Sequence, residues 1–175
     1  MDLALLIFRV VAGLLVTSHG AMKLFGTFGG PGLHGTSGWL HSAGFRPGRL
    51  WAVMGSGAEF IGGLLFALGL LSPLGSVGIA SAMLIAVTKI HWPKVWVTEG
   101  GFEYTLVLLA VAVAVGIAGP GAFSLDAWLG ISVPPAISLV VIVLAALVYL
   151  VGMVTSAAKP TAASPKADKG TQPAA

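Results

Sequence analysis

The sequence contains no cysteine, and only 9% of its 175 residues are charged. The lack of cysteine excludes disulfide bonds, thiolate metal sites and the dithiol relays by which some membrane oxidoreductases pass electrons to quinone. A soluble domain of this length would carry about a quarter charged residues. With 57% hydrophobic residues and a mean hydropathy of +0.98, the composition predicts an integral membrane protein.

Several motifs that carry chemistry are also missing. No two histidines lie three or four residues apart on a helix, and no cluster of carboxylates has the spacing of metal ligands. No glycine-rich loop follows a strand, as a nucleotide site would require. The net charge of +3 is spread along the chain rather than gathered in one patch, so nucleic acid is not an expected partner. We therefore predict no metal site and no intrinsic cofactor.

Five apolar runs approach or exceed the roughly 20 residues that cross a bilayer. They cover residues 3–25, 50–71, 74–92, 102–118 and 133–155. The first run is too long for a removable signal peptide and lacks its basic start and cleavage site, so we expect a first membrane helix there. Pro73 ends the second run, which makes the second and third helices antiparallel neighbours. The predicted fold class is an all-α polytopic membrane helical bundle.

The spacing of these runs predicts the organisation of the chain. Residues 1–126 are expected to form a four-helix membrane domain, 127–156 an additional transmembrane helix, and 157–175 a disordered cytoplasmic tail rich in Pro, Ala and Lys. Within the first unit, 26–49 is expected to be a re-entrant or interfacial segment, in which Thr36 caps a short helix and Gly44 ends it.

The aromatic residues near the expected helix ends suggest contacts with lipid headgroups. Trp39, Leu40 and Phe45 are expected along the headgroup boundary. An aromatic belt is expected from four further tryptophans, Trp51, Trp92, Trp96 and Trp128.

Basic residues near the helix ends predict the orientation, given five spans that alternate in direction. One face holds eight of them, and the other face has only Arg9. The eight are Lys23, Arg46, Arg49, Lys89, Lys94, Lys159, Lys166 and Lys169. This bias predicts a multi-pass protein of the bacterial plasma membrane, with an outer N-terminus and a cytoplasmic C-terminus.

Polar residues inside the apolar runs are the candidates for a functional site. A charge at the depth of Glu59 costs at least about 2.5 kcal/mol, so this carboxylate should be paired, hydrated or protonated. His19 and Lys23 share one side of the first helix, and Arg9 falls within about 80° of both. These residues are expected to converge in one layer, with His19 or Arg9 as the partner of Glu59 and Lys89 as a third possibility. Glu103, at a helix N-terminus, is a further candidate.

Two roles are consistent with such a polar layer. A buried ion pair can fix which helices pack together, or it can bind a ligand and transfer protons.

Four segments resemble the DoxX family of small bacterial and archaeal membrane proteins. They are HGAMKLFG, EFIGGLLFALGLLSP, IHWPKVWVTEGGFEY and GPGAFSLD, and with Arg9 the resemblance extends to Asp126. It implies a four-helix transmembrane bundle. It also places six residues on the family's recurring polar positions, namely Arg9, His19, Lys23, Glu59, Glu103 and Asp126. The last of these is implied to lie near the outer end of the first helix, where contact with Arg9 would leave Glu59 to His19 and Lys23.

The family takes its name from a subunit associated with a quinone-reducing thiosulfate oxidoreductase. The resemblance therefore implies an accessory subunit of a membrane oxidoreductase system, not catalytic alone, that handles a quinone-like molecule or protons. Its expected partners are membrane lipids, a soluble cytoplasmic redox enzyme and a second copy of the chain. Two alternatives remain open, a non-catalytic scaffold that recruits soluble redox enzymes and a small-molecule permease. The fifth helix departs from the family's four-helix core.

Overall fold

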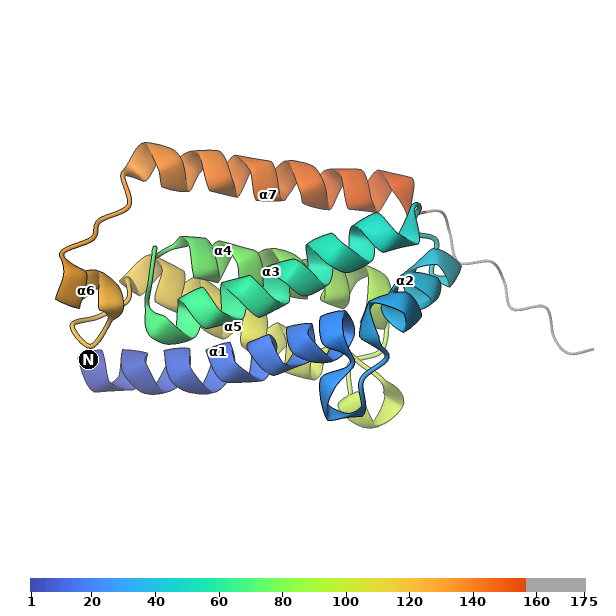
Figure 1. Cartoon of the computed structure of the whole chain (residues 1–175), viewed down its shortest axis with the longest axis horizontal. Helices are drawn as coiled ribbons and strands as arrows, with labels where there is room; N and C mark the ends of the chain where they lie inside the picture. Colours follow the sequence, from blue (N-terminus) through green and yellow to red (C-terminus); the bar gives the residue numbers. More distant parts are fainter. Residues whose placement is uncertain (157–175) are drawn as a thin grey trace, which may run out of the picture.

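The computed structural model describes residues 1–156 as a bundle of helices (Figure 1). Four helical segments in this part of the chain are long and apolar enough to cross a membrane. They are α1 (Asp2–Phe25), α3 (Gly48–Leu68), α4 (Leu74–Ile85) with its π-helical continuation η2 (Ala86–His91), and α7 (Pro135–Thr155). A shorter apolar helix, α5 (Glu103–Ala118), has 16 residues. The polytopic helical fold predicted from composition is confirmed, while the predicted tail, 157–175, lies outside the described residues.

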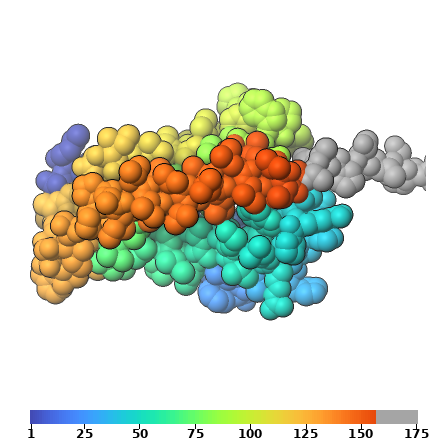
Figure 2. Space-filling view, turned by 90° about the horizontal axis from the view of Figure 1, so that it is seen from above, coloured from blue at the N-terminus to red at the C-terminus, as the bar shows by residue number. Residues whose placement is uncertain are grey.

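The long helices alternate in direction along the chain (Figure 1). The N-terminus and the short helix α6 (Leu125–Leu129) lie at one end of the bundle, called here the α6 end. The helix α2 (Gly32–Ser42) and the end of α7 lie at the opposite end, called here the α2 end. The last helix, α7, runs along one face of the molecule and leaves most of its own surface uncovered (Figure 2).

The closest helix contact is the seam between α1 and α3, where glycines replace larger side chains. A Cβ atom added to Gly13 would lie 2.7 Å from the Cβ and the backbone N of Ala67. Further along, Gly20 faces the backbone of Phe60, and Gly63 faces Thr17. Small residues of this kind allow two backbones to approach within van der Waals contact in lipid, where no hydrophobic force between helices assists packing. The seam therefore fixes the rotation of α1 against α3.

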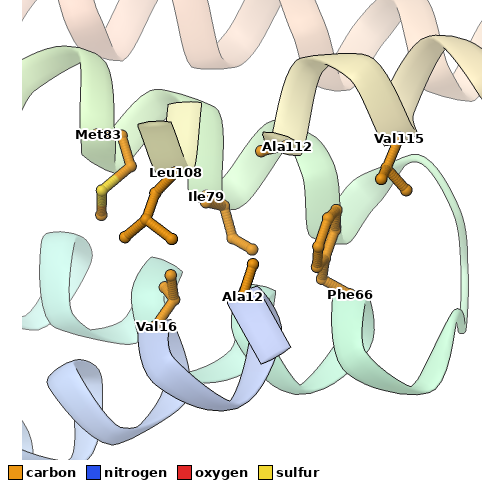
Figure 3. Close-up of a cluster of buried hydrophobic side chains, with 8 residues drawn as sticks. All are labelled: Ala12, Val16, Phe66, Ile79, Met83, Leu108, Ala112 and Val115. Atoms are coloured by element: carbon orange, nitrogen blue, oxygen red, sulfur yellow. The ribbon is translucent and has the colours of Figure 1, made fainter. Parts of the chain in front are cut away.

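A cluster of buried apolar side chains lies on the inner side of this seam (Figure 3). It is contributed by α1, α3, α4 and α5 and consists of Ala12, Val16, Phe66, Ile79, Met83, Leu108, Ala112 and Val115. Next to it, α3 and α4 approach closely at Gly62 and Gly78, as the small residues on these faces predict. The apolar cluster and the α3–α4 contact occupy the middle of the bundle, so the buried polar residues lie toward its two ends.

The segment between α1 and α3 differs from its prediction. The helix α2 begins at Gly32, directly after Pro31, and Thr36 lies inside it rather than at its N-cap. The buried hydroxyl of Thr36 donates to the backbone O of Lys23 at 3.2 Å, so it fastens α2 to the end of α1. Phe45 is buried rather than at a headgroup boundary. The first difference arises because Pro31 starts the helix before Thr36 is reached. The second arises because Phe45 packs against the rest of the bundle.

We expect Gly13→Val to lower stability, because the valine side chain would overlap Ala67 and push α1 away from α3. Overpacking of this kind costs about 1–3 kcal/mol. The measurement is unfolding by SDS titration of detergent-solubilised protein. Gly57→Val is the matched control, because no atom lies within 4 Å of a Cβ at that position. Equal stability of the two variants would contradict the close seam.

Candidate functional site

The carboxylate of Glu59 is buried and pairs with Lys23 across the α1–α3 seam. The ammonium Nζ of Lys23 donates to Oε1 of Glu59 at 2.6 Å and to Oε2 at 2.7 Å. It is the one salt bridge within residues 1–156. The side chain of Glu59 is 6% exposed and that of Lys23 is 37% exposed, so the carboxylate loses more of its hydration than the ammonium does. The pair satisfies the requirement that a carboxylate at membrane depth be compensated.

A cavity of about 370 Å³ lies beside this pair at the α2 end of the bundle. Its walls come from α1, α2, α3, the α4–η2 segment and α5. Most of the lining is apolar, and four aromatic residues contribute to it, Trp39, Phe45, Trp51 and Tyr104. The volume lies within the range of about 300–1,000 Å³ found for small-molecule sites, which are also mainly apolar with a few polar groups.

Two polar groups of α3 line this cavity on the same face of the helix, Ser56 and Glu59. Ser56 is 2% exposed, and its Oγ has no hydrogen-bond partner. A buried hydroxyl without a partner is costly, by about 1–3 kcal/mol. Thr105, across the cavity, is already satisfied by a bond from its Oγ1 to the backbone O of Phe102 at 2.8 Å. Ser56 therefore offers an unpartnered hydroxyl to a bound molecule.

His19 lies at the border of the same cavity. Its ring centroid is 5.8 Å from that of Tyr104, with the two planes inclined by 52°. A second hollow of about 340 Å³ lies between α1 and α2, and His19, Lys23, Thr36 and Trp39 line both spaces. These four side chains form the partition between the cavity and the second hollow. The structure thus brings His19, Lys23 and Glu59 together, although the cation that pairs with Glu59 is Lys23.

Arg9 and Asp126 belong to a separate cluster at the α6 end, which corrects the expectation of a single polar layer. Arg9 and Lys23 are 14 residues apart on α1, or roughly 21 Å along its axis. Arg9 is 1% exposed, and its Nη2 donates to the backbone O of Phe123 at 2.6 Å. Its guanidinium packs over Gly69, the residue that ends α3, where a positive charge is favoured by the helix dipole. Arg9 therefore does not pair with Glu59.

Asp126 holds the turn between α3 and α4. Its two carboxylate oxygens accept hydrogen bonds of 2.8 Å from the backbone N–H groups of Leu71 and Ser72. Its own backbone N donates to the O of Gly69 at 3.0 Å. The short helix that carries it is capped by Ser124, whose Oγ accepts from the N of Ala127 at 3.1 Å. The α6-end cluster is thus a structural clamp on the hairpin.

Lys89 and Glu103 also lie away from the ion pair. Lys89 Nζ donates to the backbone O of Met153 in α7 at 3.1 Å, so it caps the last turn of that helix. Glu103 is the first residue of α5, and its Oε1 accepts from the N of Val97 at 2.9 Å. Neither residue lines the cavity. Both were candidates because of their depth along a helix, but their direction around the helix points them to other partners.

Trp51 and Phe45 were expected at the lipid headgroups, yet both are buried and line the cavity. Their rings meet edge to face with centroids 5.5 Å apart. By contrast, Trp92, Trp96 and Trp128 are exposed, as an aromatic belt would require. The sequence contained one signal for the cavity, since Gly55 and Ser56 lie three or four residues before Glu59 on its face of α3.

Removal of Lys23 and removal of Glu59 should lower the stability of the protein to different extents. Lys23→Met leaves a buried carboxylate uncompensated, and we expect a loss of about 2–3 kcal/mol, below the 3–5 kcal/mol of a fully buried pair because Lys23 is partly exposed. Glu59→Gln leaves a hydrated ammonium and should cost about 1 kcal/mol or less. SDS titration of both variants and of the double variant measures the coupling. Equal losses from the two single variants would contradict this account.

Asp126→Asn should loosen the α3–α4 turn, because the carboxamide nitrogen cannot accept the backbone N–H that it would face. We expect a loss of about 1–3 kcal/mol by the same titration. Asp2→Asn is the matched control, since Asp2 accepts one bond, from the N of Ala122, in an exposed place. A loss no larger than that of the control would show that Asp126 is not a clamp.

Comparison with known proteins identifies the family. The DoxX family model matches residues 4–92, which is half of the chain and includes α1 to η2 with Lys23, Glu59 and Ser56. The chain belongs to the DoxX family. No curated protein and no solved structure matches it.

Proposed function

We propose that this DoxX-family membrane protein binds a quinone-like molecule in the cavity at the α2 end and serves a membrane oxidoreductase system as an accessory subunit. The observation that carries the proposal is the mainly apolar cavity of about 370 Å³ into which an unpartnered hydroxyl and a buried ion pair are directed. A quinone combines an apolar ring with two carbonyl acceptors, so it requires an apolar cavity with a few hydrogen-bond donors.

The polar groups of the cavity fit the carbonyl oxygens of such a ring. An ammonium has three N–H donors, and Glu59 accepts from Lys23 through its two oxygens, so a further donor remains for a ligand. The Oγ of Ser56 supplies another, and bonding to a ligand would remove the cost of its burial without a partner. The ring itself would pack against Trp51 and Tyr104. Binding is thus assigned to residues of α1, α3 and α5.

Protons would reach the bound molecule through the partition beside α2. Lys23 and His19 border both the cavity and the second hollow, and Lys23 holds the buried carboxylate of Glu59. Histidine, lysine and carboxylate side chains are the groups that transfer protons at membrane depth. The proposal assigns proton handling to this chain and assigns electron delivery to a partner oxidoreductase.

The excess of basic residues at the α2 end supports a cytoplasmic location of this end by the positive-inside rule. Lys23, Arg46, Arg49 and Lys94 all belong to the α2 end or to the loop beside it. The proposed site would therefore open toward the cytoplasmic side of a plasma membrane, where a soluble redox enzyme could deliver electrons. The apolar residues of α7, which extend to the same end, are compatible with a fifth crossing.

We expect Gly55→Leu to weaken binding of a short-chain ubiquinone analogue, because position 55 lines the cavity and the leucine would occupy it. Binding is measured as saturable quenching of tryptophan fluorescence, since Trp39 and Trp51 lie in the cavity wall. Affinity should fall about tenfold or more, the scale of steric misfit in a pocket. Mass spectrometry of the gently purified protein should find a quinone retained by the unsubstituted chain and lost from the variant.

Gly57→Leu is the matched control for this experiment. It lies on the same helix, also has no atom within 4 Å of an added Cβ, and does not line the cavity. It should bind the analogue as the unsubstituted protein does. Absence of saturable quenching in the unsubstituted protein, or equal affinity of the two leucine variants, would refute the proposed site.

A further inference from the structure

The helix α7 lies beyond the part of the chain that the family model matches, and its last turns dock beside the cavity. Three hydrogen bonds mark this contact, one of them from Oγ1 of Thr88 to Sδ of Met153 at 3.9 Å. Lys89 Nζ donates to the O of Met153 at 3.1 Å, and the hydroxyl of Tyr149 donates to Oγ1 of Thr88 at 3.5 Å. Both Thr88 and Lys89 belong to the π-helical segment η2. The C-terminal turns of α7 are therefore fastened to a segment that also forms part of the cavity wall.

The segment η2 has two faces with different surroundings. Ala86, Ile90 and His91 line the cavity, whereas Thr88 and Lys89 contact α7. A π-helical turn is uncommon and often lies at a functional site. Here the contact with α7 supports the outer face of a turn whose inner face shapes the cavity.

A second contact connects α7 to the cavity through a single side chain, Trp51. A Cβ atom added to Gly152 of α7 would lie 3.0 Å from Cη2 and 3.2 Å from Cζ3 of the Trp51 indole. The indole is 8% exposed and touches the ring of Phe45, which is itself buried. Its other side lines the cavity. A side chain at position 152 therefore requires the end of α7 to move outward or the indole to shift by a few tenths of an ångström. The hydrogen bonds of Met153 and Tyr149 hold the end of α7, which favours movement of the indole.

The free space available to that movement is the cavity. Position 55, one helical turn after Trp51 on α3, has no atom within 4 Å of an added Cβ, so the space over this turn is open. A bulkier residue at position 152 would thus displace the indole and reduce the cavity volume, without any contact between that residue and the ligand.

We propose that Gly152 is a specificity-determining residue, which sets the width of the cavity by fixing the position of Trp51 from the outside. This inference rests on the proposed function where it concerns ligand size. Gly152→Val should narrow the cavity, so that a fused two-ring naphthoquinone, menadione, loses affinity by about tenfold or more while a single-ring benzoquinone analogue loses less. Both affinities are measured by saturable tryptophan quenching.

A second readout needs no ligand. The chain has no cysteine, so Ser56→Cys places a single thiol in the cavity wall. The rate of its reaction with N-ethylmaleimide reports how freely a small molecule enters the cavity. Gly152→Val in this background should slow the reaction severalfold, whereas Ala146→Val, on the exposed face of α7, should leave the rate unchanged. If Gly152→Val does not accumulate, Gly152→Ala, which adds one methyl group, should slow it to a smaller extent.

The indole is tested directly by Trp51→Ala. If position 152 acts through this side chain, Gly152→Val should have no further effect on labelling in the Trp51→Ala background. Unchanged labelling in the folded Gly152 variants, or equal slowing with and without the indole, would overturn the proposal. A different result would separate the two proposals. If neither quinone binds the unsubstituted protein but Gly152→Val still slows labelling, the proposed ligand is refuted and the role of Gly152 stands.

Discussion

The glycine seam between α1 and α3 decides where the polar groups of this bundle can lie. Gly13 and Gly63 bring the two backbones into contact, and this contact sets the rotation and the axial register of the helices. In that register Lys23, near the end of α1, reaches Glu59 in the middle of α3. A wider separation of the helices would leave the carboxylate without a cation in a low-dielectric environment. The ion pair therefore forms because the seam brings the two helices together, and it also helps to stabilise the seam.

The two ends of the bundle use buried charge in different ways. At the α6 end, Arg9 and Asp126 bind backbone groups of neighbouring turns, and neither lines the cavity or the second hollow, although Nε and Nη1 of Arg9 are buried without a partner. At the α2 end, the charges of Lys23 and Glu59 face a cavity, and a nearby hydroxyl, that of Ser56, has no partner. Charge that satisfies backbone groups stabilises a fold, whereas charge beside an apolar cavity is available to a ligand. This contrast is the physical reason to locate function at the α2 end.

The last long helix, α7, gives the cavity an outer support. Most of α7 is exposed, as expected of a helix that faces lipid, yet its final turns contact both Trp51 and the π-helical turn η2. Because packed side chains have little free volume and hydrogen bonds hold the end of α7, we expect a change at this contact to displace Trp51 toward the cavity. A helix outside the matched family region can therefore influence a cavity whose polar residues lie within that region.

The sequence by itself determined the membrane setting, the approximate bounds of the apolar helices, and the need of Glu59 for compensation, because these follow from composition, hydropathy and the cost of buried charge. It did not distinguish the 16-residue α5 from the four helical segments that are long enough to cross a membrane. Only the tertiary structure decided that Lys23 rather than Arg9 or His19 pairs with Glu59, that Lys89 turns toward α7, and that Trp51 lines a cavity. Helical periodicity gives the direction of a side chain around its own axis, but its neighbour depends on how separate helices pack side by side.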